Sequence, residues 1–392
     1  MNSHLGGSFS DLPNDRMLLI NQRCNAFELE LSRGKRPRIE DYLEDLSERE
    51  WTIAIREMLP IEIEYRGQSD AGLNVKQYLS RFPEIDSEWL STLLAQSRDG
   101  STRQSQHVPA PTEIPDRIGD YDIVEPLGQG GMGTVYRAVH RRMHRTVALK
   151  ILRGELAIKE SMKRRFEREV RAAGLLVHPN IVTAYDAGEE DGLLYLVTEF
   201  VDGQDLSECV RTRGPLAWQS AMRFILDVAT GLEYAHGKQV IHRDIKPANL
   251  LLDESGRVKI LDMGLARLGL DDLSEDGQSE LTQTGTIMGT AAYMAPEQAR
   301  DTRTADERSD IYSLGCVFYF LLSGRPVFQG ETVIDTILAH ATRPTPSLAS
   351  RLPSQQIPEQ VDAIFQKMIA KNPADRYPSV KAIARRPAQG DR

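Results

Sequence analysis

Residues Val240 to Leu251 read VIHRDIKPANLL, and this stretch decides how the rest of the chain is interpreted. Apolar residues flank it on both sides, while Asp244, Lys246 and Asn249 stand at relative positions 0, +2 and +5 inside it. Such a pattern fits neither an amphipathic helix nor a plain strand. We therefore expect a loop that is held in a core at both ends and that presents a carboxylate, an ammonium group and an amide to one site.

These three side chains suit phosphoryl transfer. A carboxylate can take the proton of an attacking hydroxyl, a lysine can neutralise the moving phosphoryl group, and an amide oxygen can ligate a divalent cation. The stretch closely matches H-R-D-x-K-x-x-N, and here the sequence resembles the eukaryotic-type protein kinase superfamily. The lysine two residues after the aspartate is similar to the serine/threonine branch, of which bacteria, planctomycetes among them, also have members.

Composition limits the class of protein. A chain of 392 residues is long for one domain, so two domains and a linker are expected. The net charge of -9 argues against a nucleic-acid partner, because no overall basic field is present to neutralise phosphates. The three cysteines form no CxxC pair, which favours a reducing compartment. The longest apolar stretch, Ile311 to Ser323, is too short to span a bilayer, and no targeting segment is visible. We therefore expect a cytoplasmic protein without a membrane span.

Residues 1–96 predict a small all-α module of four or five helices. Apolar positions spaced for helices recur over Met17–Leu31, Glu50–Glu62 and Glu88–Leu94. A weak repeat relates Arg38–Leu43 to Asn74–Leu79, each of which ends in Tyr-Leu. No catalytic constellation is visible, so we expect a regulatory or docking module. It looks like the helical leader that precedes many planctomycete-type bacterial kinases.

Composition also places the domain boundaries. Residues 97–117 are rich in Ser, Thr, Gln and Pro, which indicates a flexible linker. The kinase-like pattern then runs over residues 118–385, and residues 386–392 are expected to be a frayed C-terminus.

A glycine-rich stretch, Leu127 to Tyr136 (LGQGGMGTVY), opens the second domain. GxGxxG alone is a weak signal, because dinucleotide-binding folds use it as well. In those folds a helix follows the last glycine, whereas here β-branched residues continue as a strand. We therefore expect a loop between two antiparallel strands that covers phosphates with its backbone N–H groups. Gly128, Gly130 and Gly133 would be needed because a Cβ would hold the backbone off the phosphates.

Lys150 stands inside the apolar run Thr146 to Leu152. A buried lysine needs a partner, and the alternative is a surface lysine whose end reaches solvent. In the functional interpretation, Lys150 holds the α- and β-phosphates and pairs with a glutamate of the following helix. The resemblance implies Glu169 for this role, with Glu167 as the alternative.

The resemblance implies further contacts to ATP. The backbone of Glu199 and Val201 would meet the adenine edge, with Thr198 as a small gatekeeper and Asp205 near the ribose. Val135, Ala148 and Leu251 would enclose the ring. The residues expected to bind the nucleotide are Leu127, Gly128, Gly130, Gly133, Val135, Ala148, Lys150, Glu169, Glu199, Val201 and Leu251.

Asp262 ends a short apolar strand and is followed by Met263, where the family pattern has phenylalanine. The resemblance implies that Asp262 and Asn249 ligate Mg²⁺, with Mn²⁺ as the alternative ion. The aromatic residue is a packing element, and methionine can fill an irregular apolar space in its place.

Residues Arg267 to Met294 correspond to the activation segment of the family. We expect the protein to phosphorylate one of Thr282, Thr284 and Thr286, and Arg243 would pair with the phosphothreonine. The resemblance implies three further interactions. Thr290 would hydrogen-bond the side chains of Asp244 and Lys246, and Asp310 would hydrogen-bond the backbone of the catalytic loop. Glu297 and Arg376 would form an ion pair.

Together these features predict an α+β, bilobal protein-kinase fold preceded by the all-α module. One lobe would be an antiparallel sheet with one helix, the other mainly helical, and ATP would lie between them. The expected reaction transfers the γ-phosphoryl group of Mg-ATP to Ser or Thr hydroxyls of proteins, with Asp244 as the base. The expected partners are ATP, protein substrates and, for autophosphorylation in trans, a transient homodimer.

Two other functions are alternatives to this one. A non-catalytic pseudokinase scaffold acting through the helical module would be expected to lack the strand lysine, the catalytic aspartate or the magnesium aspartate, and Lys150, Asp244 and Asp262 are all present. A small-molecule phosphotransferase is disfavoured by the long activation segment and by Gly289-Thr290, which serve protein substrates in the family.

Overall fold

The computed structural model describes residues 12–32, 35–67, 75–99, 115–130, 133–152, 160–263, 290–300 and 305–384. The chain divides into two compact units, Met1–Pro109 and Ala110–Arg392. The finer boundaries expected at residues 96, 117 and 385 remain predictions. Most of the expected linker and the last residues lie outside the described part of the chain.

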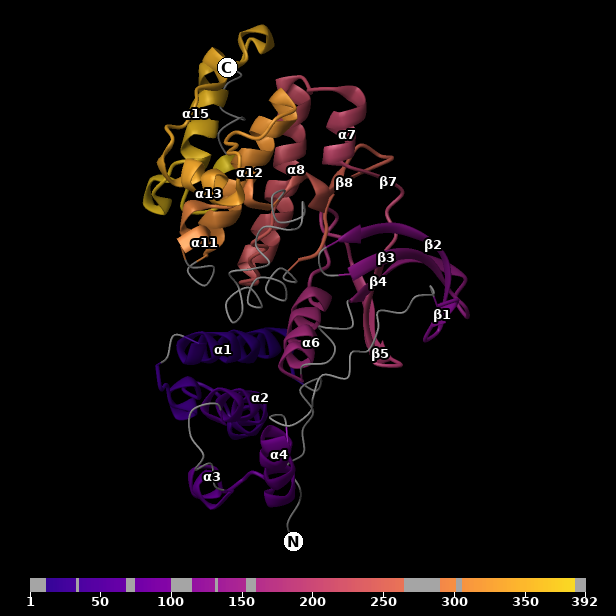
Figure 1. The fold of residues 1–392 in the computed structure, drawn as a ribbon, viewed down its shortest axis with the longest axis vertical. Helices are drawn as coiled ribbons and strands as arrows, with labels where there is room; N and C mark the ends of the chain where they lie inside the picture. The colour runs from indigo at the N-terminus through magenta and orange to yellow at the C-terminus, as the bar shows by residue number, and fades with distance from the viewer. Residues whose placement is uncertain are drawn as a thin grey trace. The chain divides into compact units, whose positions relative to one another are not determined.

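The first unit is helical, as the sequence predicted (Figure 1). Helices α1 and α2 contact each other, and α4 contacts both α2 and α3. Their apolar faces form one core, in which Ile20, Phe27 and Leu90 are fully buried. The described elements are α1 (Asn14–Ser32), the 3-10 turn η2 (Ile39–Tyr42), α2 (Glu48–Gly67), α3 (Val75–Arg81) and α4 (Ser87–Asp99).

The two hexapeptides of the weak repeat fold differently. Residues 39–42 form the single turn η2, whereas residues 75–81 form the helix α3. Arg81 of α3 bonds to Glu40 of η2 at 2.9 Å and to Glu62 of α2 at 2.9 Å. The two segments therefore meet in one partly buried ionic cluster of the helical module.

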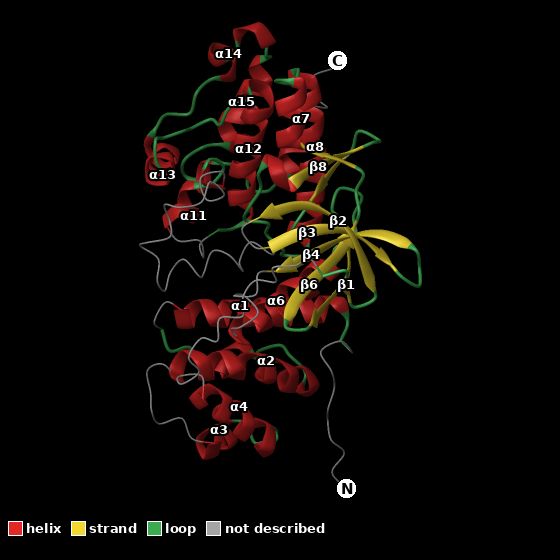
Figure 2. Cartoon of the chain, turned by 45° about the vertical axis from the view of Figure 1, so that its right-hand side comes forward, coloured by secondary structure: helices red, strands yellow, loops and turns green. Residues whose placement is uncertain are grey.

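The second unit begins with a six-stranded antiparallel sheet in the order β1-β2-β3-β4-β6-β5 (Figure 2). One face carries an apolar core that includes Tyr136, Leu149 and Val197. Helix α6 (Glu160–Gly174) contacts β5. The strands are β1 (Arg117–Ile118), β2 (Tyr121–Gly130), β3 (Gly133–His140), β4 (Arg145–Leu152), β5 (Ala184–Glu190) and β6 (Leu193–Glu199).

The rest of this unit is mainly helical, and α12 (Glu307–Ser323) lies at its centre. Twelve of its residues are buried, and it contacts both α8 (Trp218–Gly237) and α15 (Glu359–Met368). The remaining helices are α7 (Leu206–Arg213), η3 (Pro247–Asn249), α11 (Pro296–Arg300), α13 (Val333–Thr342), α14 (Leu348–Arg351), η6 (Pro353–Gln355), η7 (Pro373–Asp375) and α16 (Lys381–Ala384).

A small antiparallel sheet joins the two lobes in the order β7-β8-β9. Its strands are β7 (Gly203–Asp205), β8 (Leu250–Asp253) and β9 (Val258–Ile260). The catalytic loop leads directly into β8, so this sheet carries the predicted site. No helix among the described residues is both long enough and apolar enough to cross a membrane.

Candidate active site

The stretch Val240 to Leu251 is a loop held at both ends, as predicted. Val240, His242, Ile245 and Leu250 are buried along it. The His242 ring accepts the Asp244 N–H at its Nδ1 (3.2 Å), which leaves Nε2 as the donor to the Leu261 carbonyl (2.7 Å). The His242 side chain thus ties the loop to the residue before Asp262.

Asp310 anchors the backbone of the loop from α12, which confirms the expected support. Its carboxylate accepts the N–H groups of His242 (2.9 Å) and Arg243 (2.8 Å). His236 of α8 contributes a third contact, between Nε2 and Asp310 Oδ2 at 2.8 Å. Burial works against the charge of Asp310, but these hydrogen bonds and the nearby histidines hold its pKa below the usual value.

The three polar side chains of the loop gather around the carboxylate of Asp244. Lys246 Nζ lies 2.7 Å from Asp244 Oδ2, and Asn249 Nδ2 lies 3.0 Å from the same oxygen. Asn249 Nδ2 also donates to the Asp244 carbonyl at 2.8 Å. Lys246 Nζ donates further to Thr290 Oγ1 at 3.0 Å, the expected support from residue 290. A carboxylate flanked by an ammonium group and an amide is therefore present in one cluster.

Asp262 lies beside this cluster because β8 and β9 are paired. Leu250 faces Ile260 across the two strands, and the Leu261 N–H donates to the Asn249 carbonyl at 2.9 Å. Lys150 of β4 meets Asp262 from the other lobe, with Nζ 2.6 Å from Oδ2. Burial raises the pKa of Asp262, but Lys150 outweighs this effect and the pKa is lowered. Asp262 is therefore ionised.

Glu169 and Glu167, the two candidates for the lysine partner, differ in position on α6. Glu169 is buried, whereas Glu167 is exposed. A buried carboxylate needs a cationic partner more than an exposed one does, and Lys150 itself is only 9% exposed. This burial favours Glu169, and the carboxylate found against Lys150 in this structure is that of Asp262.

Asn249 and Asp262 fit a divalent cation. The Asn249 amide directs its nitrogen toward Asp244, so its Oδ1 points away from that carboxylate. Lys150 lies against one oxygen of the Asp262 carboxylate, Oδ2. Oxygen donors of this kind are those that Mg²⁺ prefers.

The sheet presents the residues expected around the adenine on one face. Val135 is paired with Lys150, and Ala148 with Thr198, so these four side chains point to the same side. The apolar core of the sheet lies on the opposite side. Leu251 is half-buried between buried Leu250 and Leu252. Val135 and Ala148 of the predicted set thus share one side of the first sheet with Lys150, here called the cleft face, whereas Leu251 belongs to the second sheet.

Residues 199–201, which connect the two lobes, offer backbone groups for the adenine edge. The Glu199 N–H donates to the Thr183 carbonyl at 2.8 Å, so Glu199 can present only its own carbonyl to an adenine edge. Its side chain pairs with Lys259 at 2.6 Å. Val201 is half-buried two residues later, and Asp205 caps α7 by accepting the Glu208 N–H.

The glycine-rich stretch lies between β2 and β3 as expected, but its glycines are needed for different reasons. At Gly128 a Cβ would meet nothing within 4 Å, and Leu127 beside it is 46% exposed. At Gly133 a Cβ would lie 1.9 Å from the Ile151 carbonyl oxygen. Gly133 is therefore required by the close approach of β4, not only by phosphates as the sequence suggested. Gly130 ends β2.

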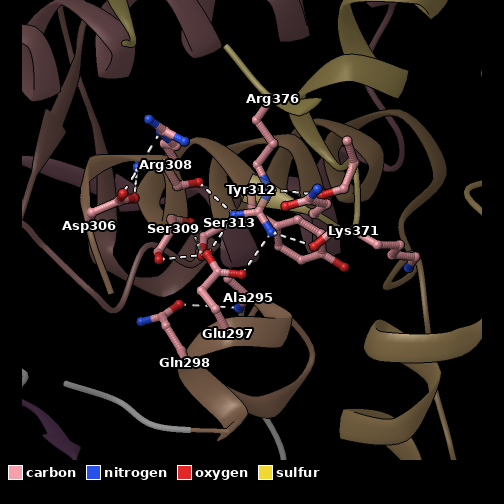
Figure 3. A network of polar contacts seen from close by, with 12 residues as sticks. Ala295, Glu297, Gln298, Asp306, Arg308, Ser309, Tyr312, Ser313, Lys371 and Arg376 are labelled. Carbon is pink, nitrogen blue, oxygen red and sulfur yellow. Dashed lines mark hydrogen bonds and ion pairs between the residues drawn. The ribbon is translucent and has the colours of Figure 1, made fainter. Parts of the chain in front are cut away.

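Glu297 and Arg376 form the predicted buried ion pair (Figure 3). Two bonds join the carboxylate to the guanidinium, at 2.6 and 2.8 Å, and the Arg376 side chain is fully buried. Arg376 also donates to the backbone carbonyls of Arg308 (2.9 Å) and Ala370 (2.8 Å). Ser309 Oγ completes the network at 2.8 Å from Glu297.

Two contacts of the site were not predicted from the sequence. His236 reaches Asp310 from 74 residues away, and Gln298 reaches the backbone of Arg243 from 55 residues away. Met263 is buried, as expected for a residue that fills an apolar space. Thr282, Thr284, Thr286 and Gly289 lie outside the described residues, so their predicted roles stay predictions.

Comparisons with known proteins agree with this geometry. The family described as "Protein kinase domain" matches residues 121–387. The serine/threonine-protein kinase PknB of Mycolicibacterium smegmatis is 43% identical over 271 residues, which cover 68% of this chain and 42% of PknB. PrkC of Bacillus subtilis is 40% identical over 259 residues, covering 66% of this chain and 38% of PrkC.

The solved structures agree. The kinase domain of Mycobacterium tuberculosis PknI matches with a TM-score of 0.54 and 28% identity, covering 69% of this chain and 97% of that domain. The chain itself spans about two fifths of the length of the curated relatives PknB and PrkC. On these grounds, the chain belongs to the protein kinase family, among the eukaryotic-type serine/threonine kinases of bacteria.

Proposed function

We propose that the protein transfers the γ-phosphoryl group of ATP to Ser and Thr hydroxyls of proteins. The observation that carries this proposal is the cluster of Asp244, Lys246 and Asn249, which lies next to the Lys150–Asp262 pair. These groups supply a base, two cations and a metal site within one cleft, which is the set that phosphoryl transfer requires.

Each side chain has a role that follows from its contacts. The Asp244 carboxylate orients an acceptor hydroxyl and takes its proton. Lys246, held between Asp244 and Thr290, neutralises charge on the moving group. Lys150, supported by Glu169, holds the α- and β-phosphates. Mg²⁺, or Mn²⁺ in its place, bound by Asn249 and Asp262 would neutralise the phosphate oxygens.

The nucleotide would lie against the cleft face of the sheet. Val135, Ala148 and Leu251 would contact the adenine, and the backbone of Glu199 and Val201 would meet its polar edge. Leu127 and the glycines 128, 130 and 133 would cover the phosphates. Support comes from the shared face of Val135 and Ala148 and from the carbonyl that Glu199 can present.

A labelling assay tests this proposal. The full-length protein is incubated with γ-labelled ATP and MgCl₂, alone and with a carrier protein that contains Ser and Thr. We expect label on Ser or Thr, and a loss of at least about 100-fold in Lys150→Met and in Asp244→Asn. Lys371→Met is the matched control, because Lys371 Nζ also meets an oxygen, the His340 carbonyl at 2.7 Å, away from the cleft. An unlabelled wild type that still binds ATP would instead favour the scaffold function.

We also propose autophosphorylation in the activation segment, at Thr282, Thr284 or Thr286, within a transient homodimer. Arg243, next to Asp244, supports the expected pairing with a phosphothreonine. Phosphopeptide mapping compares the wild type with Asp244→Asn, and an inactive, differently tagged Lys150→Met copy serves as substrate for the wild type. Label on the inactive copy would support transfer in trans. Unmodified threonines in an active preparation would refute the site.

We propose a cytoplasmic location, supported by the reducing compartment that the cysteines suggest. Cys24, Cys209 and Cys316 are all buried and free of disulfides. Fractionation of the native host with an antibody to the chain checks this. Recovery in the membrane fraction would contradict it.

A further inference from the structure

Gln298, which the proposed mechanism does not use, links two parts of the site. It lies on α11 and is 3% exposed, and Figure 3 shows its contact with Ala295. Its Oε1 accepts the Ala295 N–H at 3.1 Å, and its Nε2 donates to the Arg243 carbonyl at 3.0 Å. One side chain therefore joins the residues before α11 to the residue that precedes Asp244.

The peptide it reaches is under strain. Arg243 has a φ of 67°, a left-handed conformation that a non-glycine residue adopts only at a cost in free energy. Its N–H is bonded to Asp310 Oδ1 at 2.8 Å, and its carbonyl is bonded to Gln298 Nε2. Two side chains from two different helices thus hold the polar groups of this one residue.

Residues 290–298 meet the catalytic loop at two separated points. At one point Thr290 Oγ1 accepts from Lys246 Nζ, and at the other Gln298 donates to Arg243. Asp244 lies between these two points in the sequence. The Tyr293 N–H bonds to the Thr290 carbonyl at 3.1 Å, so the segment between the two points is itself turned back on its own backbone.

We propose that Gln298 is a positioning residue. It fixes the backbone of Arg243 relative to residues 290–298, and it thereby fixes the position of the Asp244 carboxylate. This inference rests on the proposed kinase function. The role needs an amide, because one end must accept an N–H while the other donates to a carbonyl. A carboxylate could accept from Ala295 but would repel the Arg243 carbonyl, and an aliphatic side chain would leave both buried groups unpaired.

Steady-state kinetics of Gln298→Leu and Gln298→Glu test the role. Because the change misplaces Asp244 and leaves the cleft face of the sheet intact, we expect kcat to fall about 10- to 100-fold while the KM for ATP stays within about twofold of wild type. A purely structural role would lower the amount of folded protein and leave the kcat of the folded fraction unchanged.

The pH profile of Gln298→Glu gives a second readout. A protonated carboxyl has an O–H donor and a C=O acceptor, so it can replace both bonds of the amide. Within the described part of the chain, charged groups on the elements next to Gln298 include Arg243 and Asp244 of the loop, Asp310 of α12, and the Glu297–Arg376 pair. We expect the ratio of Gln298→Glu activity to wild-type activity to rise as the pH falls from 8 to 6, and the ratio for Gln298→Leu to stay flat.

Matched controls and a readout without catalysis complete the test. Gln366 of α15 also donates its Nε2 to a backbone carbonyl, that of Pro346 at 2.6 Å, so Gln366→Leu and Gln366→Glu lose a similar bond away from the site. We expect them to keep the wild-type kcat. Hydrogen–deuterium exchange of residues 242–249 should speed up in Gln298→Leu and not in Gln366→Leu.

The outcomes separate this inference from the function on which it rests. If Gln298→Leu has the kcat of wild type, or if exchange of residues 242–249 is unchanged, the positioning role is refuted and the kinase function stands. If the wild type transfers no phosphoryl group, the kinase function fails, and the exchange experiment still decides whether Gln298 holds the loop.

Discussion

At the scale of single residues, the site depends on charged groups that are distant in sequence. Lys150 and Asp262 are 112 residues apart, yet their charged atoms lie 2.6 Å from each other. The pair brings the sheet lobe to the aspartate that we propose as a metal ligand, and the charge of Lys150 lowers the pKa of Asp262. Removing either charge should therefore affect catalysis more than folding.

Asp262→Asn tests the carboxylate. The amide has nearly the same size but no charge, so it binds a divalent cation poorly and cannot pair with Lys150. We expect activity at saturating ATP to fall at least about 100-fold, and half-maximal activity to require more Mg²⁺. A magnesium titration measures both. Asp253→Asn is the control, because Asp253 serves a local turn by accepting from Arg257 N–H (2.9 Å) and Ser255 Oγ (2.6 Å). Equal titrations of both variants would contradict the metal role.

Arg376→Ala tests the buried ion pair. The change leaves the Glu297 carboxylate without its guanidinium in a site where the Arg376 side chain is fully buried. We expect the free energy of unfolding to drop by about 3–5 kcal/mol, because a buried charge without a partner is costly. Urea unfolding followed by circular dichroism measures this. Arg211→Ala, which removes an exposed pair with Glu208, should change little. If both variants were equally stable, the burial argument would be wrong.

At the scale of elements, α12 organises the helical lobe. It supplies Asp310 to the catalytic loop and packs against α8 and α15. The helix is apolar enough to be buried over most of its length, and its first turn is capped by Asp306, which accepts the Arg308 N–H. Its packing leaves no room for extra atoms on the side of α15.

Gly315→Ala tests that packing. A Cβ at this position would lie 2.5 Å from Ile369 Cγ2 and 3.0 Å from Met368 Cβ. We expect a loss of about 1–3 kcal/mol in the free energy of unfolding, because a close-packed core yields only at a cost. Gly237→Ala, at the end of α8 with open space around the new Cβ, is the control. A thermal melt of both variants measures the difference, and equal melting temperatures would show that α15 can move aside.

At the scale of the whole molecule, the chain consists of two units with separate cores. The helical unit depends on ion pairs that acid removes. Hydrogen bonds from Arg81 lower the pKa of Glu40 to about 2, and those from Arg16 and Ser47 lower the pKa of Glu50 to about 2. In the unfolded chain both carboxyls have a pKa of about 4.5.

This difference predicts acid sensitivity of the helical unit. Carboxyls whose pKa is lower in the folded state stabilise it fully above pH 4.5, and this stabilisation is lost as the pH falls from about 4.5 to about 2. In Trp218→Phe the two remaining tryptophans, Trp51 and Trp89, both lie in this unit. We expect the urea midpoint of their fluorescence to decrease between pH 5 and pH 3. Glu50→Gln should reduce this dependence, and a midpoint that does not change with pH would refute the role of the ion pairs.

The fold class could be predicted from the sequence alone, and so could the grouping of Asp244, Lys246 and Asn249 on one loop. Three short contiguous patterns indicated the chemistry of the site: the loop from Val240 to Leu251, the glycine-rich turn and the strand lysine. The bilobal arrangement, the anchoring by Asp310 and the Glu297–Arg376 pair followed from a family resemblance that these patterns carried, and the structure contains all three.

Contacts that no local pattern encodes could be identified only in the folded chain. Folding placed Glu169 inside and Glu167 outside on one helix, required Gly133 for the approach of β4, and brought Gln298 to the carbonyl of Arg243. A glutamine next to a family motif has no periodicity and no spacing that would reveal its partner. Its role arises because folding buries both ends of the Gln298 amide between the strained Arg243 peptide and the turn before α11. Buried polar groups in such a place need hydrogen-bond partners.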